Sequence, residues 1–142
     1  LGLNGLARGG DGTAAPAQLS QVKSTAPIKP NYAPSGISNH ELIGVETGAR
    51  IAAGIVYFKD KDFPYVMHYD EVLICKSVKG RFEIVVEGKA QRMVPGDMVY
   101  LPEGSHVRYR SVGEAVMYFA VTPADWLKRV PPEELKAAGE QH

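Results

Sequence analysis

The sequence is poor in cysteine and has no excess of either charge. Cys75 is its one cysteine, and 16 Lys and Arg residues balance 16 Asp and Glu residues. A single cysteine excludes an internal disulfide framework and suits a reducing compartment. Balanced charge provides neither the basic field that nucleic acid attracts nor an acidic tail. We therefore expect no nucleic-acid partner.

Long apolar runs are also missing. The longest extends only from Ile51 to Phe58, whereas a helix needs roughly 20 apolar residues to cross a bilayer. The N-terminus does not show the charged start, apolar segment and cleavage site that a secretory signal would have. From these absences we expect no membrane partner and predict a cytoplasmic protein.

Short strands separated by glycine and proline fill the middle of the chain. The expected strands cover residues 40–45, 50–58, 65–75, 81–86, 91–94, 98–101, 106–110 and 115–121. Short strands at this spacing are typical of an antiparallel barrel or jelly roll. The sequence therefore predicts an all-β fold.

The chain length suits one domain, with a further segment on each side of the barrel. Residues 1–38 are rich in Gly, Ala, Pro, Ser and Asn and show no regular apolar period, which predicts a flexible arm. The alternative is an arm held extended by its prolines and packed across a partner subunit. We place the barrel at 39–126 and a short C-terminal helix or tail at 127–142, where Pro131-Pro132-Glu133-Glu134 has the composition of a first helical turn.

Three stretches of the expected barrel carry a recognisable pattern. Met67-His68-Tyr69-Asp70-Glu71 enters a strand, the residues from Pro95-Gly96-Asp97 to Pro102-Glu103-Gly104 enclose another, and Pro123-Ala124-Asp125-Trp126 closes the region. These stretches resemble motifs of the cupin superfamily and, within it, of the ethanolamine-utilisation protein Q (EutQ) family. The resemblance implies a single-domain cupin, a jelly-roll barrel with a small-molecule ligand at its mouth. We expect such a protein to be a homodimer.

The sequence departs from the family pattern in two places. Metal-dependent cupins use histidines where this sequence has Tyr65, Met67 and Val107, so that only Glu71 survives from the ligand set. A divalent metal needs three or more good donors, and we therefore expect no metal and no other cofactor at the usual cupin position. The interval from Glu71 to Gly80 is longer than usual, which predicts a bulge or a longer turn there.

Glu71 is the leading candidate for chemistry. Because side chains alternate along a strand, Tyr65, Met67, Tyr69 and Leu73 should share its face. An apolar cavity beside tyrosines should raise the pKa of the Glu71 carboxyl and suit a general acid or base near neutral pH. The alternative is a structural carboxylate hydrogen-bonded to a turn. Tyr65 and Tyr69 would donate hydrogen bonds to a substrate oxygen, or would simply fill the barrel.

His68 completes the expected catalytic group. By alternation it points outward, but a turn before Glu71 would bring its imidazole to the cavity mouth, where it titrates near pH 7. We expect Trp126 to cap the open barrel end. The expected substrate-binding residues are Met67, Tyr100, Val107, Tyr109 and Tyr118.

Alternation also separates two sets of residues on the strand at 106–110. Val107 and Tyr109 should point inward, and His106, Arg108 and Arg110 should point outward. The outward set is a solvated or subunit-facing surface that blocks aggregation, or else an anion site.

Proton transfer needs no metal, so the sequence favours a lyase, isomerase or dehydratase reaction on a small oxygenated metabolite. A second possibility is a non-catalytic ligand sensor or an accessory protein of a microcompartment for ethanolamine-type catabolism. The family resemblance also implies acetate kinase-like phosphoryl transfer. The sequence has no Walker-type phosphate loop, and no cluster of carboxylates for magnesium is evident in it.

Overall fold

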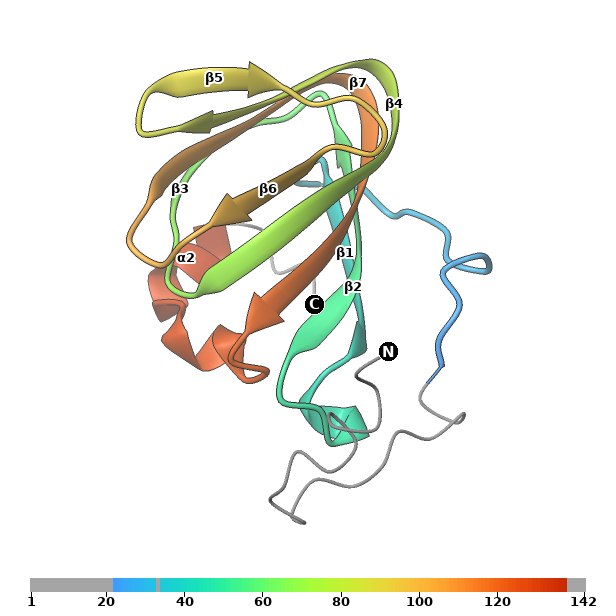
Figure 1. Ribbon diagram of the computed structural model, residues 1–142, viewed down its shortest axis with the longest axis vertical. Helices are drawn as coiled ribbons and strands as arrows, with labels where there is room; N and C mark the ends of the chain where they lie inside the picture. Colours follow the sequence, from blue (N-terminus) through green and yellow to red (C-terminus); the bar gives the residue numbers. More distant parts are fainter. Residues whose placement is uncertain (1–21, 33, 138–142) are drawn as a thin grey trace, which may run out of the picture.

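The computed structural model describes residues 22–32 and 34–137. Its elements are β1 (Ile37–Ile43), η2 (Val45–Thr47), β2 (Ala52–Lys59), β3 (Asp62–Val66), β4 (Asp70–Val86), β5 (Lys89–Arg92), β6 (Met98–Leu101), β7 (His106–Thr122), η3 (Trp126–Arg129) and α2 (Pro132–Ala137). All the strand pairs are antiparallel. The predicted all-β jelly-roll barrel with a short C-terminal helix is confirmed (Figure 1).

Two long strands, β4 and β7, form the spine of the barrel. They pair along their whole length, from Asp70 opposite Thr122 to Val86 opposite Val107. In one layer β2 and β1 extend the sheet beside the second half of β7, while β6 pairs with the first half of β4. In the other layer β3 pairs with the first half of β7, and β5 pairs with the second half of β4. Both long strands thus pass from one layer to the other, and the core lies between the layers.

The bend in these strands depends on two glycines that face each other. Gly80 on β4 is paired with Gly113 on β7, and both have positive φ angles, of 118° and 79°. A Cβ atom at Gly80 would meet the Val112 carbonyl oxygen, and one at Gly113 would meet the Lys79 carbonyl oxygen. Only glycine therefore allows the two backbones to approach this closely.

A register shift between Cys75 and Ser77 lies just before this bend. It confirms the bulge predicted from the long interval between Glu71 and Gly80. A bulge adds a residue to one strand of a pair and increases the local twist. The insertion is absorbed there, so Glu71 and Leu73 keep their inward direction.

The observed strands divide the chain differently from the predicted ones in three places. The expected strand at 65–75 is split, because the chain turns between β3 and β4 and Met67 exchanges backbone hydrogen bonds with the turn at Gly104 and Ser105. The rest of it is continuous with the expected strand at 81–86 in β4, and the expected strands at 106–110 and 115–121 are one continuous strand, β7. The sheet bends at Gly80 and Gly113, which lie between these pairs of expected strands, without ending.

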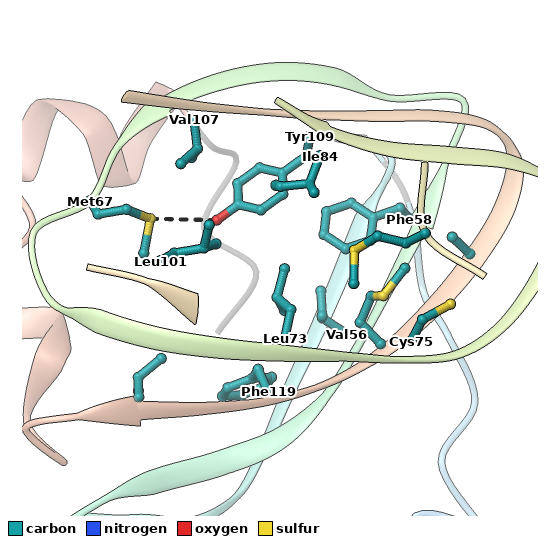
Figure 2. Close-up of a cluster of buried hydrophobic side chains, with 14 of the residues drawn as sticks. Val56, Phe58, Met67, Leu73, Cys75, Ile84, Leu101, Val107, Tyr109 and Phe119 are labelled. Atoms are coloured by element: carbon teal, nitrogen blue, oxygen red, sulfur yellow. Dashed lines mark hydrogen bonds between the residues drawn. The ribbon is translucent and has the colours of Figure 1, made fainter. Parts of the chain in front are cut away.

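The core consists of inward side chains from both layers. Leu73, Phe82, Leu101 and Met117 are all fully buried, and each buried side chain of this size contributes about 1.5–3 kcal/mol to folding. Figure 2 shows part of this core, with Leu73, Leu101 and Tyr109 labelled; the Tyr109 hydroxyl lies 3.6 Å from the Met67 sulfur. Removing these apolar surfaces from water is the main force that holds the two layers together.

The predicted alternation on β7 is confirmed. Val107 and Tyr109 are buried, while His106 and Arg110 are exposed. Arg108 and Arg110 both lie near Asp62 on the neighbouring strand, at 2.7 and 3.8 Å. Their outer-face ion pairs are solvent-exposed and contribute little to stability.

The last part of the expected N-terminal arm packs against the chain's own barrel. The Tyr32 hydroxyl donates to Glu114 at 3.2 Å, Lys59 lies over the Tyr32 ring, and the Asn31 amide donates to the Ser38 hydroxyl at 2.9 Å. The rest of the arm prediction falls on residues 1–21 and 33, outside the described residues. No helix within the described ranges has the length and apolar character needed to cross a bilayer.

Candidate functional site

A cavity of about 120 Å³ lies inside the barrel beside the C-terminal segment. Five strands supply most of its wall, and η3 and α2 add Trp126 and Glu134. Half of the wall residues are aromatic. In the part of the chain that the structure describes, the charged side chains on the wall are Glu71 and Glu134, and both are acidic. Enclosed, largely apolar spaces with a few polar groups are the usual sites for small ligands.

Glu71 projects into this cavity from β4. Alternation along the strand directs Glu71 and Leu73 inward and Val72, between them, to the opposite face. The hydroxyl of Tyr109 on β7 donates a hydrogen bond to Glu71 Oε1 at 3.2 Å. Burial away from water raises the pKa of Glu71 to about 7, although the Tyr109 hydrogen bond partly opposes this shift. Near neutral pH, Glu71 is therefore present both as the acid and as the carboxylate.

Three tyrosines share the cavity wall with this carboxyl: Tyr65, Tyr69 and Tyr109. Burial raises the pKa of each, and the negative charge of Glu71 raises it further. They stay neutral at physiological pH and retain hydroxyl protons for hydrogen bonds. Strand alternation thus placed Tyr65, Tyr69 and Glu71 on one face, and the structure brings all three to one cavity.

His68 lies behind the cavity wall. Its ring packs edge-on against Tyr65, and its Nε2 is 2.9 Å from Glu134 Oε2. The His68 side chain is 25% exposed and does not itself line the cavity. It positions Glu134, which does. The sequence hypothesis places the His68 imidazole at the cavity mouth. In the structure the Glu134 carboxylate lines the cavity, and the His68 imidazole lies behind it.

The sequence reasoning missed several wall residues, and two of them are polar or charged. Glu134 attracted attention only as part of a helix start, and no spacing in the sequence indicates that this helix folds back onto the barrel. Asn39, on β1, lines the cavity as well. Its Oδ1 atom is buried and has no hydrogen-bond partner among the described residues. Buried polar atoms are nearly always hydrogen-bonded, so this acceptor is an unusual feature of the wall.

Trp126 closes the C-terminal side of the cavity. Its ring centroid lies 5.0 Å from that of Tyr69, and its indole Nε1 donates to Glu41 Oε1 at 2.9 Å. It is both a cap for the barrel end, as expected, and part of the cavity wall.

Four of the expected substrate-binding residues do not line the cavity. Met67 and Val107 are buried in the adjacent core, where the Met67 sulfur contacts the Tyr109 hydroxyl (Figure 2). Tyr100 is 58% exposed on β6, and Tyr118 lies beneath the Lys76 ammonium group.

The position of the two outer tyrosines corrects the sequence hypothesis and has a simple cause. Tyr100 pairs with Val72, and Tyr118 pairs with Ile74. These partners alternate with the inward residues Glu71 and Leu73, so both tyrosines point to the outer face of the sheet.

The residues around Glu71 do not fit a divalent metal. Within the described residues there is no group of three or more His, Cys, Asp or Glu side chains arranged to hold a metal ion. The nearest side chains to the Glu71 carboxyl include the neutral Tyr109 hydroxyl and, beyond it, the Met67 thioether. On the described wall, Glu71 and Glu134 are the two carboxylates, which is fewer than the three or more nitrogen, thiolate or carboxylate donors that a divalent metal requires.

Comparison with known proteins identifies the family. The family model described as "Ethanolamine utilisation protein EutQ" matches residues 19–128. The chain belongs to this family. Curated relatives from several bacteria are named "Acetate kinase EutQ". The one from Clostridioides difficile (strain 630) is 24% identical over 86 residues, which cover 61% of this chain and 54% of the relative. The one from Escherichia coli (strain K12) is also 24% identical over 86 residues, covering 36% of its length. The chain thus spans about half or less of these relatives.

Solved structures show the same barrel. The Clostridium difficile EutQ protein has a TM-score of 0.65 at 21% identity, covering 77% of this chain and 93% of that one. Ectoine synthase from P. lautus has a TM-score of 0.61 at 18% identity, covering 72% and 77%. These similarities establish a cupin fold for this EutQ family member.

Proposed function

We propose that the cavity carries out proton transfer on a small oxygenated metabolite, with Glu71 as the acid or base. The observation that carries this proposal is the position of the Glu71 carboxyl on an aromatic cavity wall, with its pKa raised to about 7. A group with a pKa near the working pH is best able both to accept and to return a proton. The reaction would be of the lyase, isomerase or dehydratase type.

The neighbouring tyrosines support such a reaction. Tyr65 and Tyr69 line the same cavity and hold their hydroxyl protons at neutral pH. A hydrogen bond from either hydroxyl would stabilise negative charge that develops on a substrate oxygen when a proton leaves the adjacent carbon. Tyr109 orients the Glu71 carboxyl through the 3.2 Å hydrogen bond. His68 would act as a positioning residue, since it contacts Glu134 and not the cavity.

Isotope exchange tests this proposal without a known product. The purified protein would be incubated in D₂O with acetaldehyde, glycolaldehyde or hydroxyacetone, and deuterium next to the carbonyl followed by NMR. We expect exchange in at least one of these compounds, and its loss in Glu71→Gln. Glu83→Gln is the matched control, because Glu83 lies on the same strand but pairs with Arg81 on the outer face. Absence of exchange with the native protein, or equal exchange in Glu71→Gln, would overturn the proposal.

The names of the curated relatives favour a second candidate, acetate kinase activity. Phosphoryl transfer requires positive groups or magnesium to neutralise the phosphates. Within the described residues, the cavity wall contains no lysine or arginine. We would test this candidate by incubating the full chain with ATP, magnesium and acetate and measuring acetyl phosphate. Formation of acetyl phosphate would establish the kinase reaction, and its absence would leave proton transfer as the better supported function.

The assembly and location also remain proposals. We propose a homodimer in the cytoplasm, the state expected for a cupin of this family from the sequence. Light scattering on the purified chain would test the assembly, and a mass equal to one chain would contradict it.

A further inference from the structure

The charge on the cavity wall has one sign. The two charged side chains that line the cavity in the described part of the chain, Glu71 and Glu134, are both carboxylates. They come from opposite parts of the sequence, β4 and α2, and reach the same enclosed space. A low-dielectric cavity strengthens the electrostatic effect of such groups on a ligand. It therefore favours a positively charged ligand and disfavours an anion.

The rings that form the wall also suit a cation. Tyr69 lies between Tyr65 and Trp126, with ring centroids 6.4 and 5.0 Å away. Phe63 in turn stacks with Tyr65 at 5.8 Å and with Tyr109 at 6.4 Å. The faces of aromatic rings carry partial negative charge and attract ammonium groups, and clusters of several rings recognise organic cations in this way.

The side chain of Asn39 provides an independent observation. Asn39 lines the cavity, and its buried Oδ1 atom accepts no hydrogen bond from any described residue. A buried acceptor without a partner is unfavourable, and a ligand that donates a hydrogen bond relieves this cost. The ligand should therefore carry an N–H or O–H group as well as its charge.

We propose that the cavity binds a small organic ammonium ion that donates a hydrogen bond, through N–H or O–H, to Asn39. Glu71 and Glu134 balance its charge, and the rings contact its alkyl groups. This inference rests on the proposed function only in taking the cavity as the ligand site. It does not require Glu71 to transfer a proton.

Three compounds of nearly equal shape but different charge distinguish the effect of ligand charge on affinity from the effect of ligand size. Choline is a cation with a hydroxyl group, 3,3-dimethylbutan-1-ol is its neutral equivalent, and 3,3-dimethylbutanoate is an anion. Calorimetric titration of the full chain near pH 8 should show choline binding at least about tenfold more tightly than the neutral alcohol. The carboxylate should bind more weakly than either. Choline that fails to bind at concentrations up to about 10 mM, or that binds no more tightly than the alcohol, would overturn the proposal.

Substitutions of Glu134 and Asn39, the two polar wall residues that the sequence reasoning missed, test whether the ligand binds in this cavity. Glu134→Gln should weaken choline binding by about three- to tenfold and leave the neutral alcohol unchanged, since only the charge is removed. Glu133→Gln is the matched control, because the neighbouring Glu133 is exposed and lies outside the wall. Asn39→Leu should weaken both compounds, because both donate a hydroxyl. An equal effect of Glu134→Gln on choline and the alcohol would contradict the proposed role of its charge.

The two proposals can fail separately. Charge-selective choline binding by a protein that shows no isotope exchange would contradict proton transfer and support the cation site. Isotope exchange that depends on Glu71, in a protein with no preference for choline over its neutral equivalent, would contradict the cation site alone.

Discussion

The two halves of the barrel interior are built from the same strands but differ in character. Toward the bend, the inward side chains of β4 and β7 are apolar and fully packed, as Phe82 and Met117 are. At the open end, the same two strands place Glu71 and Tyr109 on a cavity wall. Strand alternation, shifted by one residue at the bulge between Cys75 and Ser77, directs all four residues inward. An inward side chain belongs to the packed core where other side chains cover it, and to the cavity wall where none do. The packing of the C-terminal segment and β1 at the open end determines which inward side chains remain uncovered.

Removing a large side chain from the packed half should have the greatest effect. Phe82 is fully buried and its ring lies 5.3 Å from that of Phe58. Phe82→Ala would leave a cavity that the surrounding barrel cannot close, at a cost of about 3–5 kcal/mol in the free energy of unfolding. Chemical denaturation would measure it. Val112→Ala is the control, since Val112 is 68% exposed on β7 and should change stability by less than about 0.5 kcal/mol.

Replacing Glu71, the carboxyl of the open half, should increase the free energy of unfolding near pH 8, whereas Phe82→Ala decreases it. The pKa of Glu71 is about 7 in the folded protein and near 4.5 when the side chain is unperturbed. The folded state therefore holds this proton more tightly. Its stabilising effect is complete below pH 4.5 and is lost as the pH rises through 7. We expect Glu71→Gln to be more stable than the native protein near pH 8, by roughly 2–4 kcal/mol, and similar to it at low pH.

The difference between the two unfolding curves isolates the contribution of Glu71 from that of all other titrating groups. It would be measured by urea denaturation of both proteins from about pH 5 to pH 8.5. Parallel curves over this range would show that the Glu71 carboxyl is not buried as the structure indicates. A stabilised Glu71→Gln protein would also demonstrate that this carboxyl is retained at a cost to stability, which is typical of functional sites.

The site residues whose direction follows from strand alternation were predictable from the sequence. Those that reach the cavity only because separate elements pack together were not. Tyr65, Tyr69 and Glu71 lie within one short stretch, and covalent geometry fixes their common face. Asn39 and Glu134 reach the same cavity only because β1 and α2 pack at the open end. No local pattern in the sequence encodes that packing.

The same distinction explains the errors in the strand assignment. Gly113 and Gly80 each appear as strand breaks when read alone. Paired across two strands, they allow a close backbone approach and a bend in a continuous ladder. A sequence pattern shows that a glycine is present but does not show its partner.

A smaller effect is expected for the hydrogen bond at the boundary of the two halves. Tyr109→Phe removes the hydroxyl that donates to Glu71 and contacts Met67. That hydrogen bond lowers the pKa of Glu71, so its loss should raise the pKa above 7 by up to about one unit. A carbon-13 NMR titration of the Glu71 carboxyl would measure the change. An unchanged or lowered pKa would show that Tyr109 does not stabilise the charged form.

The smallest effect should come from a tyrosine on the outer face of the same strand. Tyr118 lies an odd number of residues from Tyr109 along β7, and it points away from the cavity toward Lys76. Tyr118→Phe should leave the Glu71 pKa and choline affinity unchanged, and should alter stability by less than about 0.5 kcal/mol. The carbon-13 NMR titration, the choline calorimetry and chemical denaturation would measure these three properties. A shift in the Glu71 pKa in Tyr118→Phe would mean that the outer face of the sheet is energetically coupled to the cavity. The difference between the open and packed halves could then no longer be explained by inward side chains alone.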